Sequence, residues 1–193
     1  NSISSGQVLH CPYDYEKTKL IIKEMTENLV LELVEKHLVT NQIVITVGYD
    51  IDNLSNKNIS YKGEVTEDRY GRKVPKHAHG TINLEHKTSS TKLIMNSAVE
   101  LFDRIIDKNL LTRRINITAN NVVNEYEAEN KNKFEQMNLF IDYNQKQKEM
   151  EFKEKNLQKS ILDIKKKYGK NAVLKGMNFI EGGTMIERNA QVG

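Results

Sequence analysis

Two segments of regularly alternating residues most constrain what this chain can fold into. In residues 41–51, an apolar face of Ile43, Ile45, Val47, Tyr49 and Ile51 alternates with Val44, Thr46, Gly48 and Asp50, and residues 77–87 follow the same pattern. Period-two alternation is typical of a β-strand that has one apolar and one polar face. The pattern therefore predicts a sheet that is covered on one side only.

Two further segments have helical spacing and lie next to these strands in the sequence. Residues 16–38 and the segment between Thr91 and Asp107 carry apolar residues at steps of three and four, which predicts amphipathic helices. Asp14 is a suitable N-cap for the first helix, and residues 88–91 (Thr-Ser-Ser-Thr) supply one for the second. The apolar stripes are Leu20, Ile22, Met25, Leu29 and Leu33 in the first helix, and Ile94, Ala98, Leu101, Phe102 and Ile105 in the second.

Two outer strands complete the pattern. Residues 5–13 are interpreted as a short strand, and residues 111–120 alternate again, with Arg113 as an exception to the apolar face. The order is strand-helix-strand, a long loop or protruding ribbon at residues 52–74, and strand-helix-strand again. This order predicts an α+β domain in which a four-stranded sheet carries both helices on one face, followed by a C-terminal helical tail.

The polar face of the predicted sheet carries hydroxyl, amide and basic groups with almost no carboxylate. Residues 57–92 contain eight bases and four acids, whereas residues 14–36 contain six acids and four lysines. A domain with one basic and one acidic side can orient on a polyanion, although charge alone fits an ordinary solvated surface equally well. The residues expected on the polar face are Thr46, His79, Thr81, Asn83, Lys87, Arg114, Asn116 and Thr118.

No group of residues in the sequence predicts a catalytic or metal-binding site. Asp50 and Asp52 lie where a strand meets a loop, but two-metal phosphoryl transfer needs further carboxylates. His77 and His79 have no third ligand in the pattern, which favours solvated or phosphate-facing imidazoles over a zinc site. Cys11 has no base motif beyond one adjacent histidine, and no glycine loop suited to phosphate is present. We therefore expect no active site in this chain.

The residues after the sheet are predicted to form a separate part. We divide the chain into a domain at residues 1–126, a linker at residues 127–142 and a charged, glycine-containing tail at residues 143–193. The linker contains Gln-Met-Asn-Leu-Phe at residues 136–140, and its exposed apolar pair is typical of a segment that enters a partner's pocket. Spacing predicts a helix over residues 143–168, whose apolar stripe is Met150, Leu157, Ile161, Ile164 and Tyr168.

The composition indicates a soluble, cytoplasmic protein. The single cysteine, Cys11, cannot form an internal disulfide, which suits a reducing compartment. No apolar run approaches the roughly 18 residues that span a bilayer. Because the chain begins at Asn1 in the middle of a pattern, we expect it to be a piece of a longer protein.

Several stretches of the chain resemble a known family. Residues 1–9 (NSISSGQVL), residues 70–81 (YGRKVPKHAHGT) and the order of strands and helices are similar to the little-finger domain of Y-family translesion DNA polymerases. Residues 157–172 and 175–178 resemble the C-terminal ends of the UmuC-like branch of Gram-positive bacteria. The resemblance implies a role in DNA repair and the SOS response within a DNA-directed DNA polymerase. It also implies that the catalytic carboxylates and Mg²⁺ belong to a palm domain outside this chain.

The resemblance implies two kinds of contact. The polar sheet face would grip the backbone of damaged or primer-template DNA without reading its sequence. Residues 136–140 would dock to the bacterial sliding clamp, because they match the Gln-x-x-Leu-Phe pattern of clamp-binding polymerases. The implied clamp contacts are Gln136, Met137, Asn138, Leu139 and Phe140. The implied DNA contacts are Ser5, Arg72, Lys73, Lys76, His77, His79, Thr81, Asn83, Lys87, Arg114, Asn116 and Thr118.

Other interpretations of the same features stay open. Leu139 and Phe140 could pack on the domain or begin the tail helix instead of entering a clamp. The tail itself could pack back, exchange between copies or recruit a repair or recombination protein, with DNA contact minor. An RNA-binding sheet is less favoured, because the strands lack the aromatic pair that stacks bases.

Overall fold

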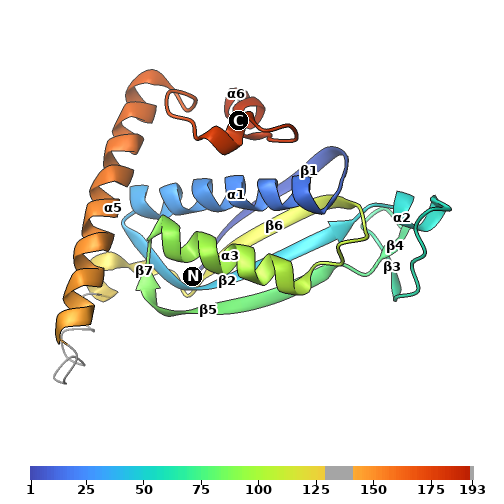
Figure 1. Cartoon of the computed structure of the whole chain (residues 1–193), viewed down its shortest axis with the longest axis horizontal. Coiled ribbons are helices and arrows are strands. Elements are labelled where there is room, and N and C mark those ends of the chain that lie inside the picture. Colours follow the sequence, from blue (N-terminus) through green and yellow to red (C-terminus); the bar gives the residue numbers. More distant parts are fainter. Residues whose placement is uncertain (129–140, 192–193) are drawn as a thin grey trace.

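An antiparallel sheet covered by two helices forms the framework of the computed structural model, which describes residues 1–128 and 141–191 (Figure 1). The long strands follow the order β1-β6-β2-β5, and a two-residue strand, β7, pairs with one end of β2. The α+β class is confirmed, but the sheet of the described residues has five strands instead of the predicted four. The bounds are β1 (Ile3–Tyr13), α1 (Tyr15–Glu35), β2 (Leu38–Tyr49), β5 (Ala78–Thr88), α3 (Thr91–Ile105), β6 (Thr112–Asn120) and β7 (Val123–Asn124).

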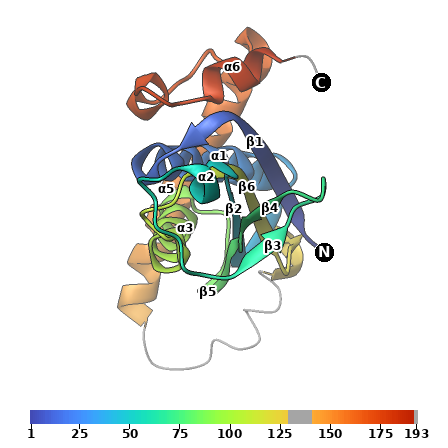
Figure 2. The same ribbon diagram turned by 90° about the vertical axis from the view of Figure 1, so that its right-hand side faces the viewer.

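Helices α1 and α3 lie on the same face of the sheet and bury its apolar side (Figure 2). Their predicted stripes point inward, and most of the sheet residues that meet them are fully buried. Removing this apolar area from water is the main stabilising contribution to the domain. The central residues are Ile22, Met25 and Leu29 of α1, Ile94, Ala98, Leu101 and Phe102 of α3, Ile43, Ile45 and Val47 of β2, and Ile115, Ile117 and Ala119 of β6.

The N-terminal ends of both helices follow the predicted capping. The Asp14 carboxylate accepts the backbone N–H of Lys17 at 2.9 Å, and the Ser90 hydroxyl accepts that of Leu93 at 3.2 Å. Each bond satisfies one of the N–H groups that the first turn of a helix leaves without an internal partner.

The C-terminal boundary of α1 and both ends of β2 differ from the prediction. Helix α1 ends at Glu35 because His37 adopts a φ of 54°, which reverses the chain into β2. Strand β2 then begins at Leu38 and ends at Tyr49. The expectation that Ile51 belongs to the apolar face was wrong, since its side chain follows the strand and is 40% exposed.

A β-bulge explains the break in the apolar alternation of β6. Between two paired positions, β6 advances from Arg114 to Thr112 while β2 advances only from Gly48 to Tyr49. The extra residue is Arg113, which therefore leaves the core pattern without disturbing the strands on either side.

The connection between the two halves projects beyond one end of the sheet (Figure 1). It contains α2 (Asp52–Ser55) and an antiparallel pair, β3 (Val65–Glu67) and β4 (Lys73–Pro75), so the predicted protruding ribbon is confirmed. We call residues 52–76 the ribbon. Asn53 fastens its base, because Nδ2 donates to the carbonyls of Asp50 and Leu111 at 2.8 Å and Oδ1 accepts the N–H of Leu111 at 2.7 Å.

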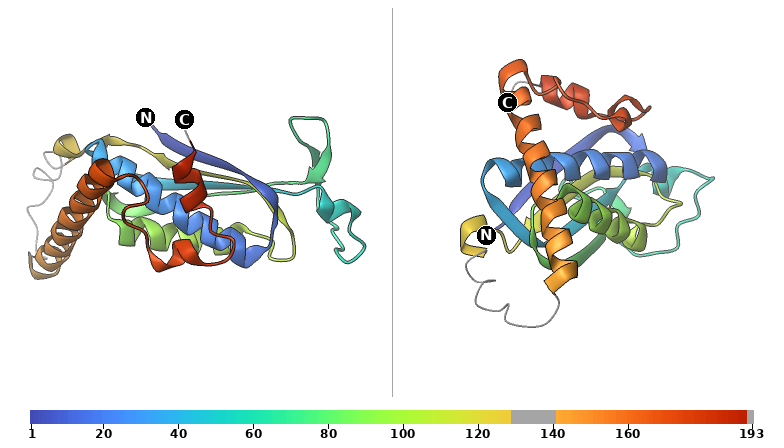
Figure 3. Two further views of the ribbon diagram at one scale, coloured as in Figure 1. Left: turned by 90° about the horizontal axis from the view of Figure 1, so that it is seen from above. Right: turned by 60° about the vertical axis from the view of Figure 1, so that its left-hand side comes forward.

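The tail packs back on the helix side of the domain (Figure 3). Its long helix, α5 (Ile141–Tyr168), crosses the ends of α1 and α3, and the segment with η1 (Gly176–Phe179) and α6 (Met185–Ala190) lies over α1. Within the described residues, no helix is both long and apolar enough to cross a membrane.

The apolar stripe predicted on the tail helix is not the face that packs on the domain. Met150, Leu157 and Ile164 of this stripe are 53%, 62% and 40% exposed. The docked face instead contains Gln158, which is 4% exposed, and Leu162, which packs against the core. Of the alternatives that the sequence left open, the tail packs back on the domain, and it does so through a face other than the apolar stripe.

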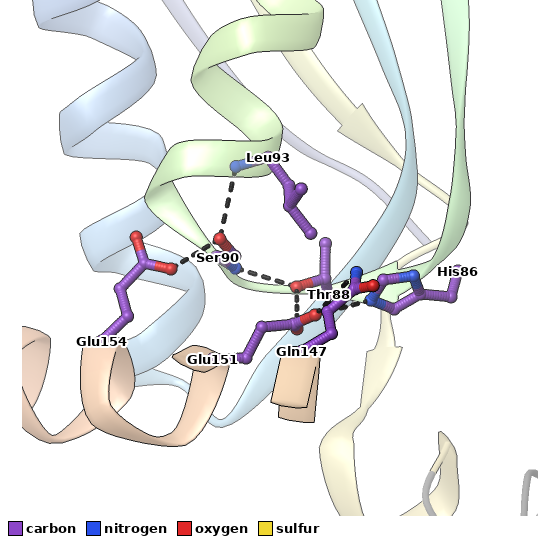
Figure 4. A network of polar contacts seen from close by, with 7 residues as sticks. All are labelled: His86, Thr88, Ser90, Leu93, Gln147, Glu151 and Glu154. Carbon is purple, nitrogen blue, oxygen red and sulfur yellow. Dashed lines mark hydrogen bonds and ion pairs between the residues drawn. The ribbon is translucent and has the colours of Figure 1, made fainter. Parts of the chain in front are cut away.

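Hydrogen bonds to the end of β5 and the start of α3 determine which face of α5 packs on the domain (Figure 4). The Glu151 carboxylate accepts the Thr88 hydroxyl at 2.9 Å and bonds His86 Nε2 at 3.0 Å. The Glu154 carboxylate accepts the Ser90 hydroxyl at 2.6 Å. Because Ser90 is the N-cap of α3, Glu154 also places a negative charge at the positive end of that helix dipole.

The acidic side of α1 faces the tail. Lys175 Nζ lies 2.8 Å from Glu27 Oε1, and Lys166 Nζ lies 3.0 Å from Glu35 Oε1. Two acids of residues 14–36, Glu27 and Glu35, therefore help to hold the basic tail against the domain, which the count of charges along the chain did not reveal.

Candidate nucleic-acid interface

Side chains on the uncovered side of the sheet stand in cross-strand rows. Residues that pair across antiparallel strands point to the same side, and residues two apart along a strand occupy successive rows. We call this surface the open face. Its rows are Val8, Arg114 and Gly48; Gly6, Asn116, Thr46 and His79; Ser4, Thr118, Val44 and Thr81; and Asn120, Gln42 and Asn83.

Hydrogen bonds within the rows hold the polar side chains in place. Thr46 Oγ1 and His79 Nδ1 are 2.9 Å apart. Asn120 Nδ2 donates to Gln42 Oε1 at 3.1 Å, and Gln42 Nε2 donates to Asn83 Oδ1 at 2.9 Å. This chain of amides leaves the Nδ2 group of Asn83 oriented to donate to a ligand, at little further cost in side-chain entropy.

The rows of the described open face contain Arg114 and no Asp or Glu. A phosphate that approaches these rows meets hydroxyl, amide and guanidinium donors without repulsion from a carboxylate. Glycines leave room beside the donors: a Cβ on Gly48 would lie 3.3 Å from Arg114 Cβ, and one on Gly6 would lie 3.5 Å from Asn116 Oδ1. The open face is therefore suited to a polyanion's backbone.

The ribbon adds cations at one end of the sheet, but two of them are already paired. Arg72 Nη2 lies 2.6 Å from Asp68 Oδ2, and Lys76 Nζ lies 2.7 Å from Glu64 Oε2. Hydrogen bonds from Arg72 lower the pKa of Asp68, so this carboxylate stays charged. Lys73, in contrast, has no ion pair among the described residues.

Most residues predicted to contact DNA lie where they were expected. His79, Thr81 and Asn83 of β5 and Arg114, Asn116 and Thr118 of β6 occupy the open face, together with Thr46. Arg72, Lys73 and Lys76 lie on the ribbon, and His77 joins the ribbon to β5.

Two predicted residues do not belong to the rows of the open face. Ser5 pairs with Ile117 and therefore belongs to the helix-covered side, while Ser4 takes the position on the open face. A shift of one residue along a strand exchanges the two faces, and the sequence of β1 alternates too weakly to reveal the correct one. Lys87 follows an irregularity in the pairing after Asn83, so the rows do not include it.

The open face also contains residues that the prediction did not include. Gln42 precedes the buried Ile43, so its parity along β2 was a signal that could have found it. Asn120 follows the buried Ala119 in β6, so its parity could have placed it on the open face in the same way. The position of Gly48 beside Arg114 depends on strand pairing, which one sequence does not reveal.

The candidates for metal binding have other contacts. Asp50 Oδ2 lies 3.7 Å from Arg113 Nε, and Asp50 Oδ1 accepts the backbone N–H of Asp52 at 2.9 Å. The rings of His77 and His79 are 6.4 Å apart and meet edge to face. Among the described residues, no group of three or more His, Cys, Asp or Glu side chains could hold a metal ion.

The predicted clamp-binding segment, residues 136–140, lies outside the described residues. Helix α5 begins directly after it at Ile141.

Comparisons with known proteins identify the family. The family model described as the impB/mucB/samB family C-terminal domain matches residues 1–147. Among curated proteins, none matches the chain. Two solved structures are similar: an insertion ternary complex of Dbh DNA polymerase (TM-score 0.38, 12% identity, 64% of this chain) and a post-insertion binary complex of the same polymerase (TM-score 0.38, 13% identity, 63% of this chain). The chain covers 29% of the length of either polymerase. Because the family model spans most of the sequence, this chain belongs to the impB/mucB/samB C-terminal domains, the little-finger domains of Y-family DNA polymerases.

Proposed function

We propose that this chain is the DNA-gripping domain of a translesion DNA polymerase, which binds the backbone of damaged or primer-template DNA without sequence specificity. The observation that carries the proposal is the open face, where rows of hydroxyl and amide groups and Arg114 occur without a carboxylate. Groups of this kind donate hydrogen bonds to phosphate and sugar oxygens, and such contacts position a protein on DNA without reading its sequence.

The proposal also covers the polymerase to which this domain would belong. The parent would be a polymerase of the UmuC-like branch that acts in the cytoplasm during the SOS response, and the resemblance of residues 157–172 and 175–178 supports this branch. Its Mg²⁺ would bind carboxylates of the palm domain, and the chain described here would supply binding surfaces instead of catalytic groups.

Fluorescence anisotropy with labelled primer-template DNA tests the grip. We expect Arg114→Ala to raise the Kd about fivefold to tenfold and to reduce the salt slope by about one, because one phosphate contact is lost. Thr118→Glu should weaken binding further by placing a carboxylate in the rows. Lys36→Ala is the matched control, since Lys36 lies at the end of α1 and is paired with Glu32.

A clear result contradicts the proposal. If Arg114→Ala and Thr118→Glu bind DNA like the unchanged chain, and if the Kd does not respond to salt, the open face is not the grip. Equal binding to DNA duplexes of unrelated sequence is the expected mark of backbone contact.

We further propose that residues 136–140 tether the polymerase to the sliding clamp. Gln136 would hydrogen-bond at one end of the clamp's pocket while Leu139 and Phe140 fill its apolar part, and such anchors supply most of the affinity of a short segment. The double substitution Leu139→Ala, Phe140→Ala should lower clamp affinity at least about tenfold. Met137→Ala, Asn138→Ala changes only the variable positions of the pattern and is the control. Equal titration curves for both variants would reject the tether.

A second candidate function is recruitment of a protein partner through the tail helix. The observation that favours it is the apolar stripe of α5, which the domain leaves uncovered at Leu157 and Ile164. In pull-downs with candidate repair proteins, Ile164→Asp should weaken capture while DNA binding stays intact. Loss of both activities together would show unfolding instead of a lost partner.

A further inference from the structure

The turn of the ribbon carries the most exposed large apolar side chain of the described residues. Tyr70 lies in the connection between β3 and β4, and its exposed fraction is 71%. Arg72 lies over the tyrosine ring, with Cζ 5.2 Å from the ring centroid. Because the guanidinium occupies one face of the ring, the opposite face is the one left for a ligand.

Hydrogen bonds of Asp68 fix the turn that carries this ring. Its Oδ1 accepts the backbone N–H of Tyr70 at 2.8 Å and that of Arg72 at 3.0 Å, while its Oδ2 accepts Arg72 Nε at 2.8 Å. Gly71 completes the turn with a φ of 74°, which residues with a Cβ rarely adopt. The ring and the guanidinium are therefore held in place before a ligand arrives, which reduces the entropy lost on binding.

The hairpin of β3 and β4 stands on the open-face side of the sheet. Figures 2 and 3 show it on the side opposite α1 and α3, at the end of the sheet where β2 ends and β5 begins. The nearest row of the open face is that of Arg114 and Gly48, since Gly48 is the last residue but one of β2. DNA that lies on the open face and extends past Arg114 therefore meets the hairpin.

The charge of the hairpin does not suit it to a phosphate contact as well as its ring suits a base. Residues 64–76 contain four bases and three acids. The ion pairs of Arg72 with Asp68 and of Lys76 with Glu64 take up four of these charges, which leaves two bases and one acid. A nearly neutral hairpin attracts a polyanion weakly, whereas an aromatic face attracts bases of any sequence.

We propose that Tyr70 stacks on an unpaired base of single-stranded DNA that adjoins the duplex held on the open face. The bases of a duplex stack on one another, so a side chain reaches the face of a base only where a strand is unpaired. Primer-template DNA has such bases in its overhang. The proposal rests on the proposed grip of the open face and deepens it, because it names the part of the DNA that the ribbon would bind.

Two DNAs test the proposal with the full chain. They share one duplex and carry overhangs of the same length at both ends, which in the second DNA consist of abasic sites. Both have the same phosphates, so a difference in Kd reports contacts to the bases. By fluorescence anisotropy, the DNA with bases should bind about fivefold to tenfold more tightly, and Tyr70→Ala should remove this difference.

Three further variants separate the ring from other contacts. Tyr70→Phe keeps the ring, so it should bind the two DNAs as the unchanged chain does. Tyr168→Ala is the matched control, since Tyr168 is 68% exposed and has Lys167 Nζ 5.2 Å from its ring centroid, but lies on the tail. Arg114→Ala should weaken binding of both DNAs by the same factor, because it removes a backbone contact.

A fluorescence signal tests the contact directly. Because the sequence contains no tryptophan, Tyr70→Trp introduces a single indole as a reporter. Its emission should be quenched by the overhangs with bases and not by the abasic ones, while Tyr168→Trp should respond to neither. Equal quenching of Tyr70→Trp by both DNAs, or none by either, would overturn the stacking.

Failure of the stacking and failure of the grip give different results. If Tyr70→Ala weakens binding of both DNAs alike, or of neither, the ring does not meet an unpaired base, and the stacking is rejected while the grip stands. Equal Kd values of the unchanged chain for the two DNAs reject it as well. If Tyr70→Phe loses as much as Tyr70→Ala, the hydroxyl makes the contact and the ring face does not. If the unchanged chain binds neither DNA in a salt-dependent way, the grip fails and the stacking fails with it.

Discussion

The carboxylate of Glu24 accepts the backbone N–H of Thr184 at 2.8 Å, although 160 residues separate the two in the chain. The same carboxylate accepts the N–H of Met185 at 3.1 Å and Nδ2 of Asn178 at 2.9 Å. Glu24 is only 2% exposed, so its charge is compensated almost entirely by donors from the tail. One residue of α1 thus anchors the C-terminal segment.

Replacing Glu24 by Gln should loosen the tail while the domain stays folded. Glutamine keeps the shape but turns one acceptor oxygen into an NH₂ group, which faces donors of Thr184, Met185 or Asn178. Hydrogen bonds to charged groups contribute about 1.5–3 kcal/mol each, so we expect the free energy of local tail opening to fall by about 2–3 kcal/mol. Native-state hydrogen exchange at the amides of Thr184 and Met185 measures this change.

Glu32→Gln is the matched control for this experiment. Glu32 lies on the same helix, and its carboxylate pairs with Lys36 at the surface. Surface pairs of this kind contribute little, so the control should leave tail exchange unchanged. Equal exchange in the two variants would show that Glu24 is not the anchor.

The contact between His86 and Glu151 makes the docking of α5 depend on pH. The hydrogen bond that His86 donates to the Glu151 carboxylate raises the pKa of His86 above 6.5, and the same bond lowers the pKa of Glu151 below 4.5. The contribution of His86 is complete below pH 6.5 and is lost as the pH rises through its raised pKa. That of Glu151 is complete above pH 4.5 and is lost as the pH falls through its lowered pKa.

Docking of α5 should therefore be strongest between pH 4.5 and pH 6.5 and weaker in mildly alkaline solution. An NMR titration should give a pKa for His86 above 6.5. Exchange protection of α5, corrected for intrinsic rates, should fall as the pH rises past the measured value. His86→Gln should remove this fall, and a fall that persists in the variant would assign it to another group.

Removing the carboxylate of Glu64 should strengthen DNA binding. Glu64 Oε2 pairs with Lys76 Nζ at 2.7 Å, so Glu64→Gln releases a cation of the ribbon for phosphate. We expect the Kd for DNA to fall about twofold to fivefold and the salt slope to steepen by up to about one. Glu35→Gln removes a carboxylate from the tail side and is the control. No change in affinity with Glu64→Gln would place Lys76 outside the DNA contact.

Asn53→Ala should destabilise the domain from the base of the ribbon. Asn53 is 1% exposed, and its loss leaves the carbonyls of Asp50 and Leu111 and the N–H of Leu111 without their side-chain partner. An unsatisfied buried group costs about 1–3 kcal/mol, so we expect the free energy of unfolding to fall by about 2–4 kcal/mol. Urea denaturation measures this, and Asn56→Ala, whose side chain is exposed on the ribbon, should change it by less than about 0.5 kcal/mol.

Patterns of near neighbours predicted much of the domain. The cap at Asp14 and the stripe through Ile94 and Leu101 depend on residues within a few positions, and both occur as expected. The exception at Arg113 was also visible in the alternation, but its cause was not. A bulge is a mismatch between two strands, and one strand alone does not show it.

The tail shows what local patterns leave open. The stripe through Leu157 and Ile164 is the apolar side of the predicted helix, and its spacing does not say whether this side meets the domain or a partner. If α5 turned this stripe toward the domain, the hydrogen bonds of Glu151 and Gln158 would break. Breaking them would leave polar groups unsatisfied, so α5 keeps its other face on the domain. Their partners lie more than 60 residues away in the chain, so no local pattern could predict them.

The sequence by itself determined the α+β class, the side of β2 that carries Thr46, and the scarcity of carboxylates on that side. Alternation along a strand is a local property, so it predicts these features without knowledge of the partners. Only the tertiary structure decided that Ser4 replaces Ser5 on the open face and that Glu24 is buried beneath the tail. Strand register and tail docking arise from contacts between distant residues, and their energies do not appear in the pattern of either segment alone.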